Sequence, residues 1–387
     1  MIYLDNSATT KIRKEALDTY VKLSTEDFGN PSSLHALGFE AEKLLRGAKD
    51  KILATLGDKG SEIVFTASGS EANNLAILGR AYSKERYKSG AKIITTAGEH
   101  ASVNEPLAKL EKEGFKVVKI PTRGGAIDKE ALDKELSRDV ILVTVMMVNN
   151  ETGALYDIPY ISKRMKALCP DAFLHVDATQ SYLKIPFTKK SLGADMITLS
   201  SHKIEGPKGV GALVIDKAVI KARGLAPIIL GGGQESGLRS GTENVPAIGA
   251  FAEAAALGHK ELSLHSECLL GLKNMLVEGL NGENFAEITV VKPEKWAPHI
   301  VNIILPKIKS ETMLHFLSSE GVYVSSGSAC SSNSQHAESA LTSFGYSAEQ
   351  ADSSIRISLS PRNTNSDIDA FLIALDKGLK RLARVGK

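Results

Sequence analysis

Short apolar runs alternate with longer segments of helical periodicity between about residue 62 and residue 216. Several runs, such as VILVTVMMV at 140–148, are apolar at successive positions, which is typical of strands that helices cover on both faces. The alternation predicts an α/β domain built around a mostly parallel, mixed seven-stranded sheet. Its strands are expected at residues 62–67, 91–97, 116–120, 140–148, 172–178, 195–200 and 209–216.

The helical segments carry apolar residues three and four positions apart. One runs from Glu71 to Tyr82, another from about Val245 to Leu257, and a third from Asp367 to Ala383. The last third of the chain mixes β-rich and helical segments and is expected to form a smaller α+β domain. With the boundary near residue 259, the large domain is predicted to cover residues 15–258 and the small domain residues 1–14 and 259–387.

Composition excludes several classes of protein. Hydrophobic residues make up 43% of the chain and charged residues 24%, and the net charge of +2 predicts neither nucleic-acid nor membrane binding. The start, MIYLDNSATT, lacks the basic and apolar regions of a secretory signal, and no apolar stretch approaches the roughly 18 residues that span a bilayer. Three cysteines without a CxxC pair fit a reducing cytosol, so a cytoplasmic protein without a cysteine metal site is expected.

Candidate chemistry begins where the first strand ends, at TASGSEANN (66–74). Free backbone N–H groups and the positive end of a helix dipole would make Gly69 and Ser70 an anion site. A plain helix cap, with Ser70 as the capping residue, explains this segment equally well. The dinucleotide and P-loop glycine motifs are absent from the sequence.

Two later strand ends add a carboxylate and an amine. Asp177 ends the apolar run FLHVD, where a carboxylate needs a cationic or hydrogen-bonding partner. Lys203 follows the next strand, where burial could lower its pKa as a Schiff-base lysine requires. Carboxyl ends of parallel strands meet at one edge of a sheet, and an anion site, a carboxylate and an amine together match the needs of pyridoxal phosphate.

Further strand ends and a serine-rich segment extend this set. His100 follows one strand and Asn150 another, so both are expected at the same edge of the sheet. Cys330 lies in SSGSACSSNS, among small polar residues that favour solvated chain. An exposed thiol is tolerated mainly where its reactivity is used, which favours a reactive cysteine over a buried one.

At this point the sequence resembles a known family. The motifs are YLDNSATT, GNPSSLH, SGSEANN, EH, VNNETG, HVDATQS, SSHKIEGPKG, LRSGTEN, SSGSAC and IRISL, and they extend over essentially the whole chain. They resemble the cysteine desulfurases of the NifS/IscS type, which belong to the class V aminotransferase superfamily and have the pyridoxal-phosphate transferase fold type I. The loop TASGSE, the segment after Cys330 and Ser360 depart from the usual family pattern.

The resemblance implies a role for each candidate residue. Lys203 would hold the cofactor covalently, His100 would stack on its ring and carry protons near the thiol, and Cys330 would receive sulfur as a persulfide. The implied cofactor-binding residues are Gly69, Ser70, His100, Asn150, Asp177, Gln180, Ser200, His202, Lys203 and, from the partner subunit of a homodimer, Thr242. Asn150 and Arg356 would bind the substrate carboxylate. No metal site is implied, apart from transient iron–sulfur ligation by Cys330.

The function implied is conversion of L-cysteine to L-alanine, with sulfur passed to an acceptor protein for iron–sulfur cluster assembly or tRNA thiolation. A selenocysteine lyase, a cysteine sulfinate enzyme or an ordinary class V aminotransferase would share the cofactor site. A non-catalytic scaffold for sulfur-transfer proteins is the alternative outside enzymes. Dependence of the reaction on Cys330 distinguishes the desulfurase from these alternatives.

Overall fold

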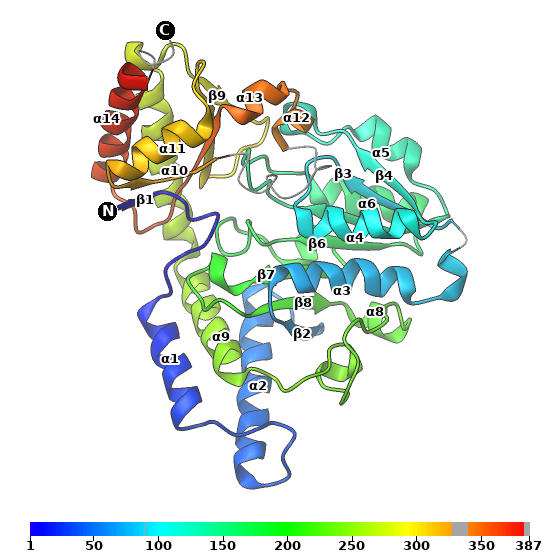
Figure 1. Cartoon of the computed structure of the whole chain (residues 1–387). Helices are drawn as coiled ribbons and strands as arrows, with labels where there is room; N and C mark the ends of the chain where they lie inside the picture. The colour runs from blue at the N-terminus through cyan, green and yellow to red at the C-terminus, as the bar shows by residue number, and fades with distance from the viewer. Residues whose placement is uncertain (89, 327–339, 383–387) are drawn as a thin grey trace.

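A seven-stranded sheet forms the centre of the larger part of the molecule (Figure 1). The computed structural model describes residues 1–88, 90–326 and 340–382. The sheet order is β2-β8-β7-β6-β5-β3-β4; β3 to β7 pair in parallel, whereas β8 is antiparallel to β2 and β7. The strands are β2 (Glu62–Thr66), β3 (Lys92–Thr96), β4 (Lys116–Ile120), β5 (Val140–Met146), β6 (Phe173–Asp177), β7 (Met196–Ser200) and β8 (Gly211–Ile215). All seven predicted strands and the mixed sheet are confirmed.

Helices cover both faces of this sheet, as the apolar strands require. Helices α3 (Gly69–Tyr82) and α4 (Ala101–Lys112) pack on one face through Leu75, Ile77 and Leu107. Helices α2 (Ala36–Thr55), α6 (Ile158–Leu168) and α9 (Val245–Lys260) pack on the other. The remaining helices of this part are α1 (Lys14–Thr25), α5 (Lys129–Glu135), α7 (Lys189–Leu192) and α8 (Lys217–Lys221). Within the described ranges, none of the helices combines the length and apolar character needed to cross a membrane.

A second, smaller part has its own apolar core, at the top left of Figure 1. Its antiparallel sheet has the order β12-β13-β10-β9, and β1 pairs in parallel with β11. The strands are β1 (Ile2–Tyr3), β9 (Thr289–Val291), β10 (Ile300–Ile304), β11 (Val322–Tyr323), β12 (Ser325–Ser326) and β13 (Ser354–Ser358). The helices are α10 (Leu262–Leu280), α11 (Ser310–Ser319), α12 (Ala340–Phe344), α13 (Ala348–Asp352) and α14 (Asn365–Leu382). This α+β arrangement fits the predicted small domain, and the exact boundary near residue 259 stays a prediction.

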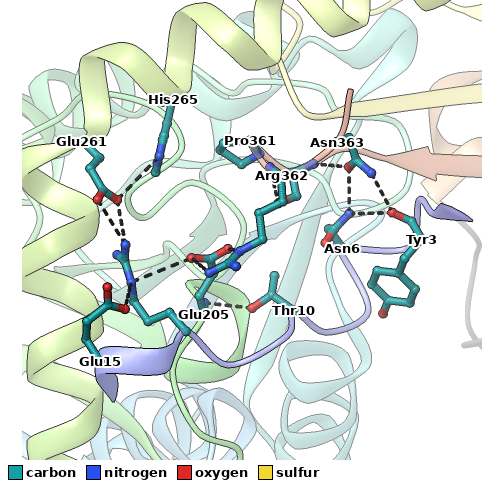
Figure 2. A network of polar contacts seen from close by, with 12 residues as sticks. Tyr3, Asn6, Thr10, Glu15, Glu205, Glu261, His265, Pro361, Arg362 and Asn363 are labelled. Carbon is teal, nitrogen blue, oxygen red and sulfur yellow. Dashed lines mark hydrogen bonds and ion pairs between the residues drawn. The ribbon is translucent and has the colours of Figure 1, made fainter. Parts of the chain in front are cut away.

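The N-terminal segment joins the two parts. After β1, the chain runs beside the loop that follows β7, where the Thr10 N–H donates to the His202 carbonyl at 2.9 Å and the Arg13 N–H to the Glu205 carbonyl at 2.9 Å. Figure 2 shows Glu205 between this segment and Arg362 of the small part, and one bond of that pair measures 3.0 Å. The loop that carries Lys203 is thereby held from both parts of the molecule.

A line of polar side chains crosses the centre of the apolar sheet. His175 on β6 is fully buried, and its Nδ1 lies 2.8 Å from the Thr144 hydroxyl on β5. Its Nε2 lies 2.9 Å from the Thr198 hydroxyl on β7. Burial lowers the pKa of His175 to about 4, so the ring is neutral and each nitrogen has a hydroxyl partner.

Candidate active site

A cavity of about 420 Å³ opens at the carboxyl ends of β5, β6 and β7. This is the position at which open parallel sheets bind ligands. The predicted site residues that line it are Gly69, Ser70, His100, Asn150, Asp177, Gln180, Ser200, His202, Lys203 and Arg356. The structure thus brings together residues that are up to 287 positions apart in the sequence, from Gly69 to Arg356. Thr242 and Cys330 are the two predicted residues outside this group.

The amino end of α3 forms one wall of the cavity. Ser68 is the N-cap, and its hydroxyl accepts from the Glu71 N–H at 3.1 Å. The expectation of a Ser70 cap is therefore wrong, because the helix begins two residues earlier than the apolar pattern indicated. A Cβ atom at Gly69 would lie 3.2 Å from the Cβ of Ser200, so only glycine leaves the backbone open at this point.

Asp177, the last residue of β6, is 6% exposed and lies inside the cavity. Its Oδ2 accepts from Asn73 Nδ2 at 2.8 Å and its Oδ1 from the Thr179 N–H at 2.9 Å. The hydrogen-bonding partner expected for this buried carboxylate is therefore an amide of α3. Asn73 itself is 1% exposed.

His100 is the N-cap of α4, and its Nδ1 accepts from the Ser102 N–H at 3.1 Å. Burial lowers the pKa of His100; the Asp177 carboxylate opposes this effect, and the positive charges of Lys203 and Arg356 add to it. His202 is also held neutral, since burial and then the charge of Lys203 lower its pKa to about 4. Both rings therefore face the cavity without charge at neutral pH.

Lys203 lies in the short 3-10 helix Ser201–Lys203 directly after β7. Its Nζ donates to the carbonyl of Ala8 at 2.8 Å and to that of Ser7. The Ser7 carbonyl also accepts from Gln180 Nε2 at 3.0 Å. The N-terminal segment thus forms a wall of the cavity and binds the amine of Lys203 and the amide of Gln180 at one place.

Arg356 enters from β13 of the small part and is 5% exposed. Its Nη1 donates to the Asn150 carbonyl at 3.1 Å and its Nη2 to Asp5 Oδ1 at 2.9 Å. Its buried Nε has no hydrogen-bond partner among the described residues. A buried guanidinium N–H without a partner is costly, and a carboxylate ligand would satisfy it.

The two predicted residues outside the cavity behave differently. Thr242 lines a separate cavity of about 200 Å³ with Arg239 and Gly241, and therefore does not reach the site of its own chain. Cys330 lies outside the described residues. The strand β12 that precedes it pairs Ser325 with Arg356, and Ser325 lines the main cavity.

Comparison with known proteins agrees with this geometry. The family model described as aminotransferase class-V matches residues 2–371. The chain is 37% identical to "Cysteine desulfurase IscS 1" of Archaeoglobus fulgidus, with 99% of this chain and 98% of that protein covered. It is 38% identical to the "NifS/IcsS protein homolog" of Lactobacillus delbrueckii subsp. bulgaricus, with coverages of 100% and 99%. The chain belongs to the class V aminotransferases and, within them, to the NifS/IscS-type cysteine desulfurases.

Solved structures support the same assignment. A structure titled "NIFS-LIKE PROTEIN" superposes with a TM-score of 0.90 at 35% identity, covering 98% of this chain and 99% of that chain. A structure titled "SspA in complex with cysteine" has a TM-score of 0.80 at 31% identity, covering 94% and 100%. The predicted fold, family and enzyme class are confirmed.

Cysteine desulfurases of this family depend on pyridoxal phosphate, and the residues present fit that group. Gly69 and the free amino end of α3 leave an open, electropositive place suited to a phosphate. Asp177 offers a carboxylate for a pyridinium nitrogen and Lys203 an amine for an aldehyde, both in the one cavity. Arg356 Nε supplies an unpaired donor for a substrate carboxylate.

Three residues that contact the site were missed by sequence reasoning: Asp5, Asn73 and Lys184. Lys184 is 8% exposed, and its Nζ donates to Gln180 Oε1 at 3.3 Å. Burial first, and then the charges of Lys203 and Arg356, lower the pKa of Lys184 to about 7. The signal for Asn73 was a polar residue on the apolar face of a helix, whereas Asp5 and Lys184 carried none.

Proposed function

We propose that this desulfurase binds pyridoxal phosphate in the 420 Å³ cavity, converts L-cysteine to L-alanine there, and passes the sulfur on through a persulfide at Cys330. The observation that supports this most is the convergence of Lys203, Asp177 and Arg356 on one cavity from three separate elements. An amine, a carboxylate and a buried guanidinium match the three polar ends of cofactor and amino-acid substrate. The row of small residues around Gly69 supports a phosphate site beside them.

When bound, the cofactor supplies an aldehyde that condenses with amines and a ring that withdraws electrons from the substrate α-carbon. Lys203 holds it covalently, and the Lys203 amine, once displaced by the substrate amine, moves protons at the α-carbon. Asp177 keeps the ring nitrogen protonated. Gln180 donates to the ring oxygen, and Gly69, Ser70, Ser200 and His202 hold the phosphate.

Arg356 and Asn150 hold the substrate carboxylate, with the Arg356 Nε–H as the free donor. The Cys330 thiolate attacks the substrate sulfur; an S–S bond forms, the Cβ–S bond breaks, and its electron pair stays with the carbon skeleton. Two protons complete L-alanine, and the sulfur leaves on Cys330 for an acceptor protein of iron–sulfur assembly or tRNA thiolation.

A homodimer is part of this proposal, with Thr242 of the partner subunit completing the phosphate site. Thr242 lies away from the cavity of its own chain, which is consistent with a role in the neighbouring one. Apolar side chains are also exposed together around the link between α1 and α2, at Phe28, Leu34, Leu37 and Phe39. Such a patch suits a partner surface.

The substitution Cys330→Ser tests the function. We expect alanine formation from cysteine to fall by roughly two orders of magnitude or more, because serine cannot accept sulfur. Cys268→Ser is the matched control, since Cys268 is a half-buried thiol on α10 that does not line the cavity, and it should retain wild-type turnover.

Undiminished alanine formation by Cys330→Ser would contradict the role of Cys330 and favour one of the other class V reactions. Rates on cysteine, selenocysteine and cysteine sulfinate measured side by side then identify which reaction. Borohydride reduction followed by peptide mass spectrometry should locate the cofactor on Lys203; attachment elsewhere would contradict that assignment.

A further inference from the structure

A chain of hydrogen bonds connects Asp177 to His100 behind the cavity wall. Asn73 Nδ2 lies 2.8 Å from Asp177 Oδ2 and 2.9 Å from Ser102 Oγ. Ser102 Oγ in turn lies 2.8 Å from His100 Nδ1. Asn73 is almost completely buried, so these bonds are shielded from water.

The direction of each bond follows from the donors present. A carboxylate only accepts, so the Asn73 amide must turn its NH₂ group toward Asp177, and its second hydrogen then meets Ser102 Oγ. The reversed amide would set Asn73 Oδ1 against the Asp177 carboxylate. Asn73 Oδ1 is instead left buried without a hydrogen-bond partner among the described residues.

The proton on His100 is fixed by the same reasoning. The Ser102 backbone N–H donates to His100 Nδ1 at 3.1 Å, so this nitrogen carries a lone pair. Because Ser102 Oγ accepts from Asn73, its own hydrogen is free to donate to the same nitrogen. The neutral ring therefore carries its proton on Nε2, the nitrogen that Ser102 leaves available to the cavity.

We propose that Asn73 is a positioning residue that, through Ser102, holds His100 in the tautomer protonated at Nε2, so that His100 enters the reaction as a hydrogen-bond donor and not as a base. This deepens the proposed function and rests on it for its catalytic meaning. The first proton taken from the substrate then falls to Lys203. The expectation that His100 carries protons is restricted accordingly, since its accepting nitrogen is already engaged.

The charges around His100 also favour the neutral ring. Lys203 and Arg356 disfavour a positive imidazole, and Asp177 opposes them. Asn73 and Thr179 donate to Asp177 and so weaken its pull on a proton at His100. Removing Asn73 or the Ser102 hydroxyl should therefore ease protonation of His100.

Nitrogen-15 NMR of histidine-labelled protein without cofactor tests the tautomer directly, with the His100 signals identified by their loss in His100→Gln. We expect the wild-type ring to be neutral at pH 7.5 and protonated on Nε2. A ring protonated on Nδ1, or a charged ring, would overturn the proposal. This readout needs no desulfurase activity, so failure of the proposed function and failure of this inference are distinguishable.

Two substitutions test the connection through Ser102. Asn73→Leu and Ser102→Ala should each raise the titration midpoint of His100 by about 0.3–1 pH unit, a twofold to tenfold change in its acid dissociation constant. The double variant should fall well short of the sum, because both changes interrupt one chain of bonds. Full additivity, or no shift in either single variant, would overturn the role of Asn73.

Asn74→Ala is the matched control on α3. Asn74 is the next residue along the helix, and its Nδ2 donates to the Ser70 carbonyl, away from Asp177 and Ser102. It should leave both the tautomer and the midpoint of His100 unchanged; an equal shift would contradict the proposal. Should Asn73→Leu fail to fold, the midpoint of His100 in Asn73→Ala and the tautomer in the wild type test the same connection.

Discussion

At the scale of single residues, two buried carboxyl groups border the cavity. Glu99 is 5% exposed, and both of its oxygens accept from the Met146 N–H, at 3.0 and 3.1 Å. Burial raises the pKa of Glu99 to about 8 and that of Glu151 to about 7, and for Glu151 the charge of Arg356 limits the rise. Both groups are therefore substantially protonated in the folded protein at neutral pH.

Glu99→Gln tests this protonation. The folded chain binds the Glu99 proton more tightly than the unfolded chain, so this group's contribution to stability is lost as the pH rises through about 8. Relative to Glu99→Gln, the wild type should lose roughly 1–3 kcal/mol in free energy of unfolding between pH 5 and 8.5.

Denaturant titrations of both proteins across this range provide the measurement. The comparison with the variant is needed because Lys184 and the buried histidines, whose pKa values are lowered, make stability rise with pH. Glu111→Gln, at an exposed position, should track the wild type. A wild type that gains stability relative to Glu99→Gln as the pH rises would contradict the prediction.

Sequence reasoning identified the residues whose chemistry is unusual for their position. Lys203 and Asp177 were predictable because each lies at the end of an apolar strand, and strand ends meet at one edge. The partners of these residues were not predictable: Asp5 pairs with Arg356 across 351 positions, and nothing local in YLDN indicates it. Asn73 reads like any polar residue of a helix until its contact with Asp177 is known.

At the scale of elements, the first wall of the cavity depends on β8 as well as α3. Gly211 begins β8 and pairs with both Thr66 and Ser200. A Cβ atom there would lie 2.5 Å from the Ser68 carbonyl carbon and 2.7 Å from the Gly69 nitrogen. The strand therefore sets the position of the helix start by close backbone contact.

Gly211→Ala should displace the start of α3. We expect a loss of about 1–3 kcal/mol in unfolding free energy from overpacking, together with weaker retention of the cofactor absorbance. Gly47→Ala on α2 is the matched control, since a Cβ atom there meets nothing within 4 Å, and it should gain up to about 1 kcal/mol. Equal stability of the two variants in thermal and denaturant unfolding would contradict the argument.

Element type was predictable over the sheet, because parallel strands buried on both faces have an unmistakable composition. Helix ends were less so. Helix α3 begins at Gly69 and not at Glu71, since the cap at Ser68 and a close contact between glycines decide the start and leave no periodic signal. The polar network of Figure 2 was equally hidden, because its members come from four separate segments.

At the scale of the whole molecule, the link between α1 and α2 projects from the large part at the bottom of Figure 1. Leu34 in this link is 106% exposed and Phe28 is 65% exposed. Apolar side chains in such positions are accounted for by a second copy of the chain. This is also the arrangement in which Thr242 could serve the neighbouring cavity.

Leu34→Asp should weaken the homodimer. We expect its dissociation constant to rise roughly 10- to 100-fold in sedimentation experiments, since a charge replaces an interface side chain. Ile373→Asp on α14 is the matched control, because Ile373 is 69% exposed on the small part and should leave the dimer unchanged. A monomeric wild type, or equal weakening by both substitutions, would contradict the proposed interface.

The buried line of Thr144, His175 and Thr198 has a consequence for how the sheet assembles. Parallel apolar strands joined by long crossovers have little in their composition that selects one alignment over another. A slip of one residue between β5 and β6 or between β6 and β7 would turn one member of the line to the opposite face and leave the imidazole without a hydroxyl. The three side chains therefore penalise misaligned intermediates during folding, and they do so on the three strands whose ends carry the chemistry.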